Sequence, residues 1–316
     1  MRKELKIGLQ RQKALSLYQA RKLTELGPVC KKILAIDKGD VNAMYMLGLS
    51  LRAQGKRKEA CKYLCKAAAA APVNKIIVTT AANELFNLEK FESAMGLYKQ
   101  LLALEPDSVA VQNNIGFCCY ALGKLKDAIK RYKQALQIDP DSAHTLNNLG
   151  IVFLELGKKR IAETLFEKAI ASDPGFHQAH YHQHLAVFRE ESPADAIAAL
   201  RSSVTVNPQN LLAKAYLAMW LDFSGKSNEA TTLFHEIEST TDQLSFMIDS
   251  WEYVTSQRTD NTRLFAVSFD ALRHAFSKTM DEGLILEFGV RQGNSINFIS
   301  RQTNSTVHGF DSFEGL

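Results

Sequence analysis

The sequence predicts a mainly α-helical protein, a superhelical solenoid of helix pairs followed by a short α/β segment. The first observation behind this prediction is a repeat: EPDS, DPDS, DPGF and NPQN recur every 34 residues, at 105–108, 139–142, 173–176 and 207–210. Such a period is typical of stacked repeat proteins. The second is the continuous apolar run GLILEFGV at 283–290, which departs from the helical pattern and is typical of a strand buried on both faces.

The 34-residue period divides residues 7–244 into seven units without an insertion. These units are 7–40, 41–74, 75–108, 109–142, 143–176, 177–210 and 211–244. Position 8 is small in most units, position 20 is alanine from the second unit on, and position 24 is bulky from there on. Small residues let the two helices of a unit approach closely, and the bulky residue fills the space beside them. Because no unit can bury its apolar face alone, the units are expected to stack.

Glycine and proline mark the ends of the helices within the units. Position 15 is glycine in four units and predicts the turn between the two helices: Gly55, Gly123, Gly157 and Gly225. Position 32 is proline in five units, where it cannot continue the second helix: Pro72, Pro106, Pro140, Pro174 and Pro208. The first unit lacks this proline and the small residue at position 20, which suits a capping repeat.

These repeats resemble the tetratricopeptide repeat (TPR) family over about three quarters of the chain. The resemblance implies an interaction scaffold whose concave groove, lined mainly by the first helix of each unit, holds a protein or peptide. Asparagines recur at positions 5 and 6 of two units: Asn113, Asn114, Asn147 and Asn148. In the O-linked N-acetylglucosamine transferase family, a ladder of such asparagines grips an extended peptide, since each amide offers a donor and an acceptor.

Two interpretations of these asparagines stay open. NIG and NLG are common in the repeat consensus, so in the first interpretation the asparagines only follow that consensus. In the second they hold the backbone of a bound peptide, and Asn114→Ala with Asn148→Ala weakens peptide capture without unfolding the array. Unchanged binding of a known partner would contradict the second interpretation.

Charge and composition narrow the classes of partner. The chain has a formal net charge of +4, but residues 1–66 hold 16 Lys and Arg against five Asp and Glu. This basic end either favours an acidic partner or is a solvated end cap. Aromatic residues are not interleaved with these charges in the way that a platform for single-stranded nucleic acid requires, so nucleic-acid binding is not predicted. No apolar run approaches the roughly 20 residues that span a bilayer, so no membrane contact is predicted.

The N-terminus and the cysteines predict a cytoplasmic protein. The start, MRKELKIGLQRQK, lacks the apolar core of a signal peptide. The five cysteines include no C-x-x-C pair, and free buried thiols suit a reducing compartment. Cys61, Cys65, Cys118 and Cys119 are expected to pack in the core, since no base or triad arrangement accompanies them.

A cluster of histidines lies in the sixth unit, at His177, His180, His182 and His184. On a helix, His180 and His184 are i,i+4 neighbours, a spacing that can hold a zinc ion. No carboxylate or cysteine completes the ligand set nearby, and positions 4 and 8 of the repeat normally pack inside the helix pair. We therefore expect internal packing of His180 and His184, and no metal site.

The repeat register ends at residue 244, and two further segments follow. Residues 245–280 have a helical pattern and are expected to link the solenoid to residues 281–316. There the apolar run ends in Gly289 and Gly293, a helix is expected from Ser295, and TVHGFD predicts a second strand that ends at Asp311. This order is a β-α-β unit of a parallel sheet. Asp311 stands 24 residues beyond Glu287, near the spacing at which a carboxylate meets ribose hydroxyls.

The motifs EFGVRQGNS and GFDSFEGL resemble the class I S-adenosylmethionine-dependent methyltransferases, especially the macrocin O-methyltransferase type. On that resemblance, Glu287 and Gly289 lie by the methionine end of S-adenosylmethionine and Gly293 shapes the turn. Asp311 takes the ribose hydroxyls, and Ser312 lies beside the nucleoside. The alternative is a generic Rossmann-like unit that binds another ligand. In the family, the catalytic, acceptor-binding and metal-binding residues lie downstream of the matched segment, so none can be assigned here.

The resemblance therefore implies a methyltransferase domain that is incomplete in these 316 residues. We expect no methyl transfer and weak or no S-adenosylmethionine binding by this chain, since two strands do not form an independently stable sheet. Any divalent metal would belong to the missing part of the domain.

Three functions follow from these observations. The first is a TPR-containing S-adenosylmethionine-dependent methyltransferase, acting on an oxygen of a small molecule or glycan, whose array binds a partner or substrate. The second is a non-enzymatic TPR scaffold. The third, a glycosyltransferase suggested by the asparagines, is disfavoured by GFDSFEGL. The coding sequence downstream of Leu316 would separate the first two.

Overall fold

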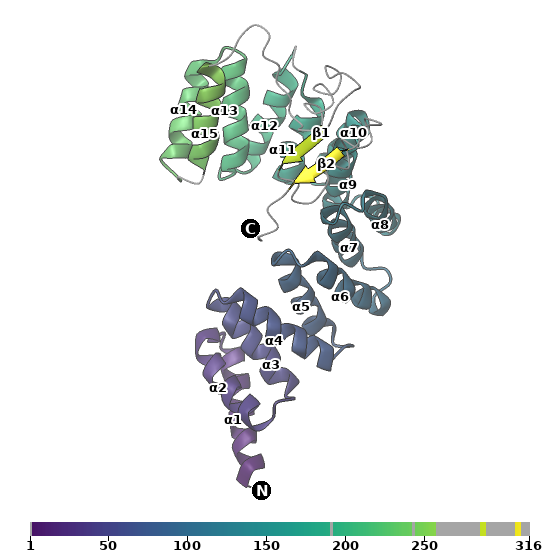
Figure 1. The fold of residues 1–316 in the computed structure, drawn as a ribbon, viewed down its shortest axis with the longest axis vertical. Helices are drawn as coiled ribbons and strands as arrows, with labels where there is room; N and C mark the ends of the chain where they lie inside the picture. Colours follow the sequence, from purple (N-terminus) through teal and green to yellow (C-terminus); the bar gives the residue numbers. More distant parts are fainter. Residues whose placement is uncertain (1, 190–191, 242–243, 257–284, 289–306, 311–316) are drawn as a thin grey trace. The chain divides into compact units, whose positions relative to one another are not determined.

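A computed structural model of the chain describes residues 2–189, 192–241, 244–256, 285–288 and 307–310. These residues form helices α1 to α15 and strands β1 and β2 (Figure 1). The chain divides into two compact units, Met1–Ile138 and Asp139–Leu316, and each is described by itself.

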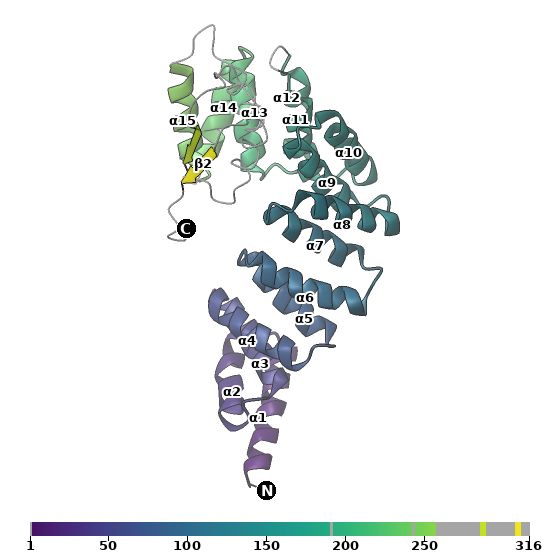
Figure 2. The same ribbon diagram turned by 45° about the vertical axis from the view of Figure 1, so that its right-hand side comes forward.

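The unit Met1–Ile138 is a stack of helices in which each helix packs on the next one in sequence (Figures 1 and 2). Its helices are α1 (Arg2–Gln19), α2 (Leu23–Ile36), α3 (Val41–Ala53), α4 (Arg57–Ala70), α5 (Lys75–Asn87), α6 (Phe91–Leu104), α7 (Val109–Ala121) and α8 (Leu125–Ile138).

The unit Asp139–Leu316 has the same construction from α9 to α14, and α15 packs against α13. Its helices are α9 (Ala143–Glu155), α10 (Lys159–Ser172), α11 (His177–Val187), α12 (Ala194–Val206), α13 (Leu211–Phe223), α14 (Ser227–Glu238) and α15 (Ser245–Ser256). Helices α3, α5, α7, α9, α11 and α13 each begin at the first residue of a 34-residue unit. The mainly helical, repeat-built fold predicted from the sequence is confirmed.

The turn at position 15 is left-handed in every described repeat. The four glycines predicted to form it have φ between 68° and 82°: Gly55, Gly123, Gly157 and Gly225. Arg21 and Glu89 occupy the same position in the first and third repeats, and they have φ of 55° and 57°. The left-handed conformation thus belongs to the repeat, and glycine is the residue that adopts it with the least steric cost.

Side-chain caps and prolines set the helix ends. Asp40, Asn74 and Ser108 each accept a hydrogen bond from the backbone N–H three residues later, which satisfies an unpaired donor in the first turn of α3, α5 and α7. Helices α6 and α8 end at Leu104 and Ile138, two residues before a proline, as predicted.

The two helices of a repeat approach each other where a small residue faces a bulky one. A Cβ atom on Gly116 would lie 2.6 Å from Cε1 of Tyr132, and a Cβ on Gly150 would lie 2.6 Å from Cε1 of Phe166. Both rings are fully buried. The pairing of positions 8 and 24 predicted from the repeat is therefore a direct contact across the helix pair.

Near the C-terminus, strands β1 (Ile285–Phe288) and β2 (Val307–Phe310) lie within the two predicted strand segments. They pair in parallel, with Glu287 opposite Gly309 and Phe288 opposite Phe310. The predicted helix from Ser295 and most of the predicted linker, 257–280, lie outside the described residues. Two paired strands do not by themselves make a Rossmann-like domain, and that assignment stays a prediction.

Candidate functional site

A cavity of about 300 Å³ lies between the first helices α1 and α3, with α2 behind it. Buried Ala14, Ile33 and Ala43 line it, and the partly exposed side chains of Leu15 and Met46 lie at its apolar edge. Exposed Gln12 and Asn42 add amide groups that can donate and accept hydrogen bonds. This combination of an apolar depression with a few amides suits one side chain and the adjoining backbone of a peptide.

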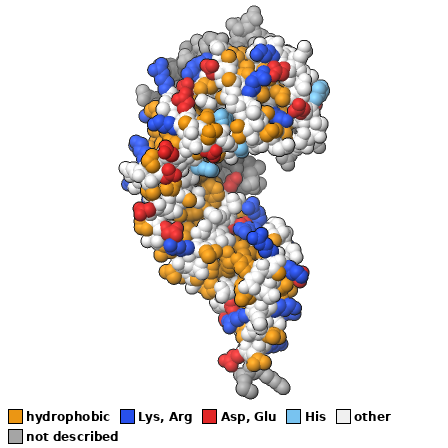
Figure 3. Space-filling model, turned by 180° about the vertical axis from the view of Figure 1, so that it is seen from behind, with side chains coloured by type: hydrophobic (Ala, Val, Ile, Leu, Met, Phe, Trp, Pro, Cys, Tyr) orange, Lys and Arg blue, Asp and Glu red, His pale blue; other side chains and the backbone are white. Residues whose placement is uncertain are grey.

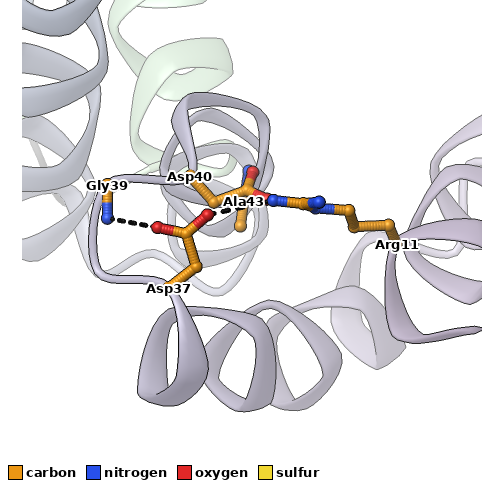
Figure 4. Close-up of polar contacts among 5 residues, drawn as sticks. All are labelled: Arg11, Asp37, Gly39, Asp40 and Ala43. Carbon is orange, nitrogen blue, oxygen red and sulfur yellow. Dashed lines mark hydrogen bonds and ion pairs between the residues drawn. The ribbon is translucent and has the colours of Figure 1, made fainter. Parts of the chain in front are cut away.

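Arg11 fastens α1 to the loop between α2 and α3 beside this cavity (Figure 4). Its Nε donates to Asp40 Oδ2 at 2.6 Å, and its Nη2 donates to Asp37 Oδ2 at 3.0 Å. Each carboxylate also accepts a backbone N–H: Ala43 donates to Asp40 at 2.8 Å, and Gly39 donates to Asp37 at 3.0 Å. The hydrogen bond with Asp40 raises the pKa of Arg11 above its usual value. The wall of the cavity is thus held in place by reciprocal contacts.

The charge of this wall differs from that of the surrounding sequence. Lys and Arg side chains are spread over the lower, N-terminal part of the face in Figure 3, in line with the basic composition of residues 1–66. At the cavity, however, Arg11 is matched by Asp37 and Asp40. The cavity therefore offers apolar and amide contacts rather than a positive field.

The four asparagines singled out in the sequence lie on the first helices of their repeats, as predicted, but they belong to different compact units of the chain. Asn113 and Asn114 are half-buried on α7 in the first unit, and Asn148 is half-buried on α9 in the second. Asn147 is buried, and its Oδ1 lies 2.8 Å from Nδ1 of His182. This amide oxygen serves packing between α9 and α11, so Asn147 offers a peptide less than its sequence position suggests.

The ring nitrogens of the histidines on α11 make polar contacts with different groups. The ring nitrogens of His177 lie 3.2 Å and 3.4 Å from the amide nitrogens of Asn207 and Asn210, and His180 Nε2 is 3.1 Å from the Pro174 carbonyl. His184 Nδ1 contacts the carbonyl of Tyr181. Within the described ranges, no three His, Cys, Asp or Glu side chains are placed to hold a metal ion.

Internal packing holds for His184, which is fully buried, whereas His180 is half-buried. Burial lowers the pKa of His184 to about 4, and the same cause lowers the pKa of His182 to about 4. Both rings are therefore neutral at pH 7.

The cysteines pack largely as predicted. Cys61, Cys118 and Cys119 are buried, and Cys65 is half-buried with its Sγ 3.8 Å from that of Cys61. Burial raises the pKa of Cys65 and of Cys118 to about 12. Such thiols are protonated and poorly nucleophilic at neutral pH.

The residues expected to bind S-adenosylmethionine lie at the edge of what the structure describes. The backbone of Glu287 belongs to β1, while Gly289, Gly293, Asp311 and Ser312 lie outside the described residues. Their role stays a prediction.

The cavity between α1 and α3 was not predicted from the sequence, because its lining residues do not recur as one residue type in the way the asparagines do. A usable pattern was present. Gln12 and Met46 occupy position 6 of the first two repeats, the same position as Asn114 and Asn148 in the fourth and fifth. The shared signal is therefore the position within the repeat rather than the residue type.

None of the helices that the structure describes is both long and apolar enough to cross a membrane.

Comparison with known proteins agrees with this architecture. Family models of the tetratricopeptide repeat match residues 41–74, 107–174 and 147–210. A tetratricopeptide repeat protein from Parabacteroides merdae superposes with a TM-score of 0.64 at 17% identity, covering 78% of this chain and 97% of that one.

Two further solved structures cover less of the chain. The Thermus thermophilus TPR protein TTC0263 has a TM-score of 0.47 at 20% identity, over 56% of this chain and 97% of that one. The protein MamA has a TM-score of 0.43 at 22% identity, over 50% and 92%. No curated protein matches the sequence. Residues 41–74 and 107–210 are tetratricopeptide repeats, within a helical fold of that repeat type.

Proposed function

We propose that this chain is a protein-interaction module that binds a peptide segment of a partner along the first helices of its repeats. The observation that carries the proposal is the cavity between α1 and α3, with an apolar edge at Leu15 and Met46 and a wall held by Arg11. Tetratricopeptide repeats commonly serve as interaction scaffolds, and the half-buried Asn114, which lies in the same compact unit as the cavity, would supply a further contact to a peptide backbone.

To test this proposal, the whole chain is used as the target for selecting a binding peptide from a displayed library of random sequences. We expect Leu15→Ala with Met46→Ala to weaken binding of the selected synthetic peptide about 10-fold or more, since two apolar contacts are lost. Leu5→Ala with Leu9→Ala is the matched control, because both leucines are exposed on α1 and do not line the cavity. Calorimetry on each variant gives the affinities.

A further variant tests the asparagine of the same compact unit separately. Asn114→Ala should weaken binding of the same peptide while leaving the circular dichroism melt unchanged. If no library peptide binds, or if the control leucines weaken binding as much as the cavity pair, the proposed function is wrong.

We also propose that residues 281–316 belong to an S-adenosylmethionine-dependent methyltransferase of the class I type. The motifs around Glu287 and Asp311 carry this proposal, and the parallel pairing of β1 with β2 supports it. In sequence, Gly289 follows Phe288 and Asp311 follows Phe310, the last pair in register. Ligands of doubly wound folds bind beyond the carboxyl ends of such strands.

The experiment is to read the coding sequence beyond Leu316 and to titrate S-adenosylmethionine into the protein made from the whole gene. We expect further alternating strands and helices, and binding that Asp311→Ala abolishes. A gene without such a continuation, or a whole-gene protein that does not bind the cofactor, leaves the non-enzymatic scaffold as the function.

A further inference from the structure

A second cavity, of about 210 Å³, lies between the second helices α6 and α8, with α7 behind it. It is lined by second helices of consecutive repeats, whereas the candidate peptide site lies between first helices. Four cationic side chains surround it together with one carboxylate: Lys99, Lys124, Lys130, Arg131 and Asp127. The cavity therefore has an excess of three positive charges, and nothing in the proposed peptide site uses them.

Among the described residues, the cations of this cavity are not held in ion pairs. In the described part of the chain, no ion pair involves Lys99, Lys124 or Lys130. Arg131 is held instead by neutral groups, since its Nη1 donates to Gln112 Oε1 and to Gln134 Oε1, each at 3.3 Å. Gln112 is buried, so it fixes one end of the guanidinium while the charge stays uncompensated.

The inner wall of the cavity is uncharged. Cys119 is only 4% exposed, and its thiol donates to Met95 Sδ at 3.8 Å. Burial raises the pKa of this thiol, so it does not supply a thiolate to balance the cations. Ile115 completes an apolar inner wall. Among the residues that line the cavity, Asp127 is therefore the one anion that meets the positive field of the outer side chains.

We propose that this cavity binds a phosphate monoester group. A phosphate monoester carries close to two negative charges at pH 7 and three strong acceptor oxygens, which suits an excess of three cations that includes a fixed guanidinium. A single carboxylate would leave most of that charge unmatched. The phosphate comes from a small molecule or from a phosphorylated side chain of a partner, and the chemistry of recognition is the same for both.

Nuclear magnetic resonance of protein labelled at its methionine methyl groups tests this proposal locally, because Met95 lines the cavity. The probes are inorganic phosphate, a phosphoserine peptide and the same peptide without phosphate, at constant ionic strength. The Met95 signal is assigned with Met95→Leu. We expect a saturable shift of that signal with a phosphorylated probe and none with the unphosphorylated peptide.

Charge variants then identify the binding groups. Lys99→Gln with Arg131→Gln should weaken binding at least about 10-fold, since two charge-assisted contacts are lost. Lys126→Gln with Lys133→Gln makes the same change in net charge on α8, outside the cavity, and should change affinity less than about twofold by screening. Asp127→Asn should tighten binding, because it removes the carboxylate that repels the ligand.

Each outcome decides the proposal. Saturable binding of inorganic phosphate and of the phosphopeptide supports the site and shows that the phosphate group suffices. Binding of the phosphopeptide alone supports the site and identifies a partner protein as the source. The proposal is overturned if neither probe shifts Met95 saturably, if the control pair weakens binding as much as the cavity pair, or if Asp127→Asn weakens it.

Discussion

Phe166→Ala is expected to lower the free energy of unfolding of the unit Asp139–Leu316 by about 3–5 kcal/mol. Phe166 is fully buried on α10, where it meets α9 at Gly150. Truncation removes the ring and leaves a cavity that two packed helices cannot close. Both tryptophans of the chain, Trp220 and Trp251, lie in this unit, so their fluorescence during urea unfolding reports on it alone.

The facing glycine gives a sharper form of the same test. A Cβ on Gly150 would lie 2.6–3.0 Å from three atoms of the Phe166 ring. In the wild type, Gly150→Ala should therefore cost about 1–3 kcal/mol by overpacking, despite the higher helix propensity of alanine. In the Phe166→Ala background the clash is absent, and the same change should stabilise by up to about 1 kcal/mol.

Gly96→Ala is the control for the propensity contribution. Gly96 is exposed within α6, and nothing lies within 4 Å of a Cβ placed on it. This change should stabilise the unit Met1–Ile138 by about 0.5–1 kcal/mol, measured by circular dichroism. Additive effects of Gly150→Ala and Phe166→Ala would show that the helix pair does not depend on this contact.

The contact at Gly150 also shows why the fold could be predicted from the sequence. A 34-residue period repeats the same packing problem, so a glycine at position 8 and an aromatic at position 24 reveal their contact by recurring together. The left-handed turn at position 15 follows in the same way, although Arg21 and Glu89 show that residue type alone would have missed two turns.

Features that occur once could not be predicted in this way. Glu84 is a buried carboxylate at position 10, where the other repeats carry residues such as Ser50 and Val152. Its only described partner is Arg57 of the neighbouring helix, with Nε 3.3 Å from Oε1. The contact between Asn147 and His182 is likewise a property of two adjacent repeats. Such pairs depend on distances between helices, and a recurring sequence pattern gives no information about a contact that occurs only once.

The second prediction concerns the loss of stability at acid pH. Between pH 7 and pH 5, the unit Asp139–Leu316 should lose on the order of 2 kcal/mol of stability for each of His182 and His184. Burial lowers their folded-state pKa to about 4, against 6.5 for an unperturbed histidine. From pH 6.5 down to about 4, the unfolded chain therefore binds more protons than the folded chain. The free energy of unfolding must fall as the pH is lowered through that window.

His184→Ala separates this effect from the titration of surface groups. Alanine occupies position 8 in other repeats, so the substitution suits the helix pair. The two proteins are compared by how their free energies of unfolding change with pH, not by their absolute stabilities. In this variant, the loss of unfolding free energy between pH 7 and pH 5 should be smaller than in the wild type by the contribution of one of the two histidines. Parallel pH profiles for the wild type and His184→Ala would contradict this prediction, because they would mean that the buried ring takes up its proton without opening the helix pair. Among the described residues, Nε2 of His184 has no hydrogen-bond partner, and the ring lies against those of Tyr181 and Tyr216. A proton on this buried nitrogen would therefore be costly in the folded state.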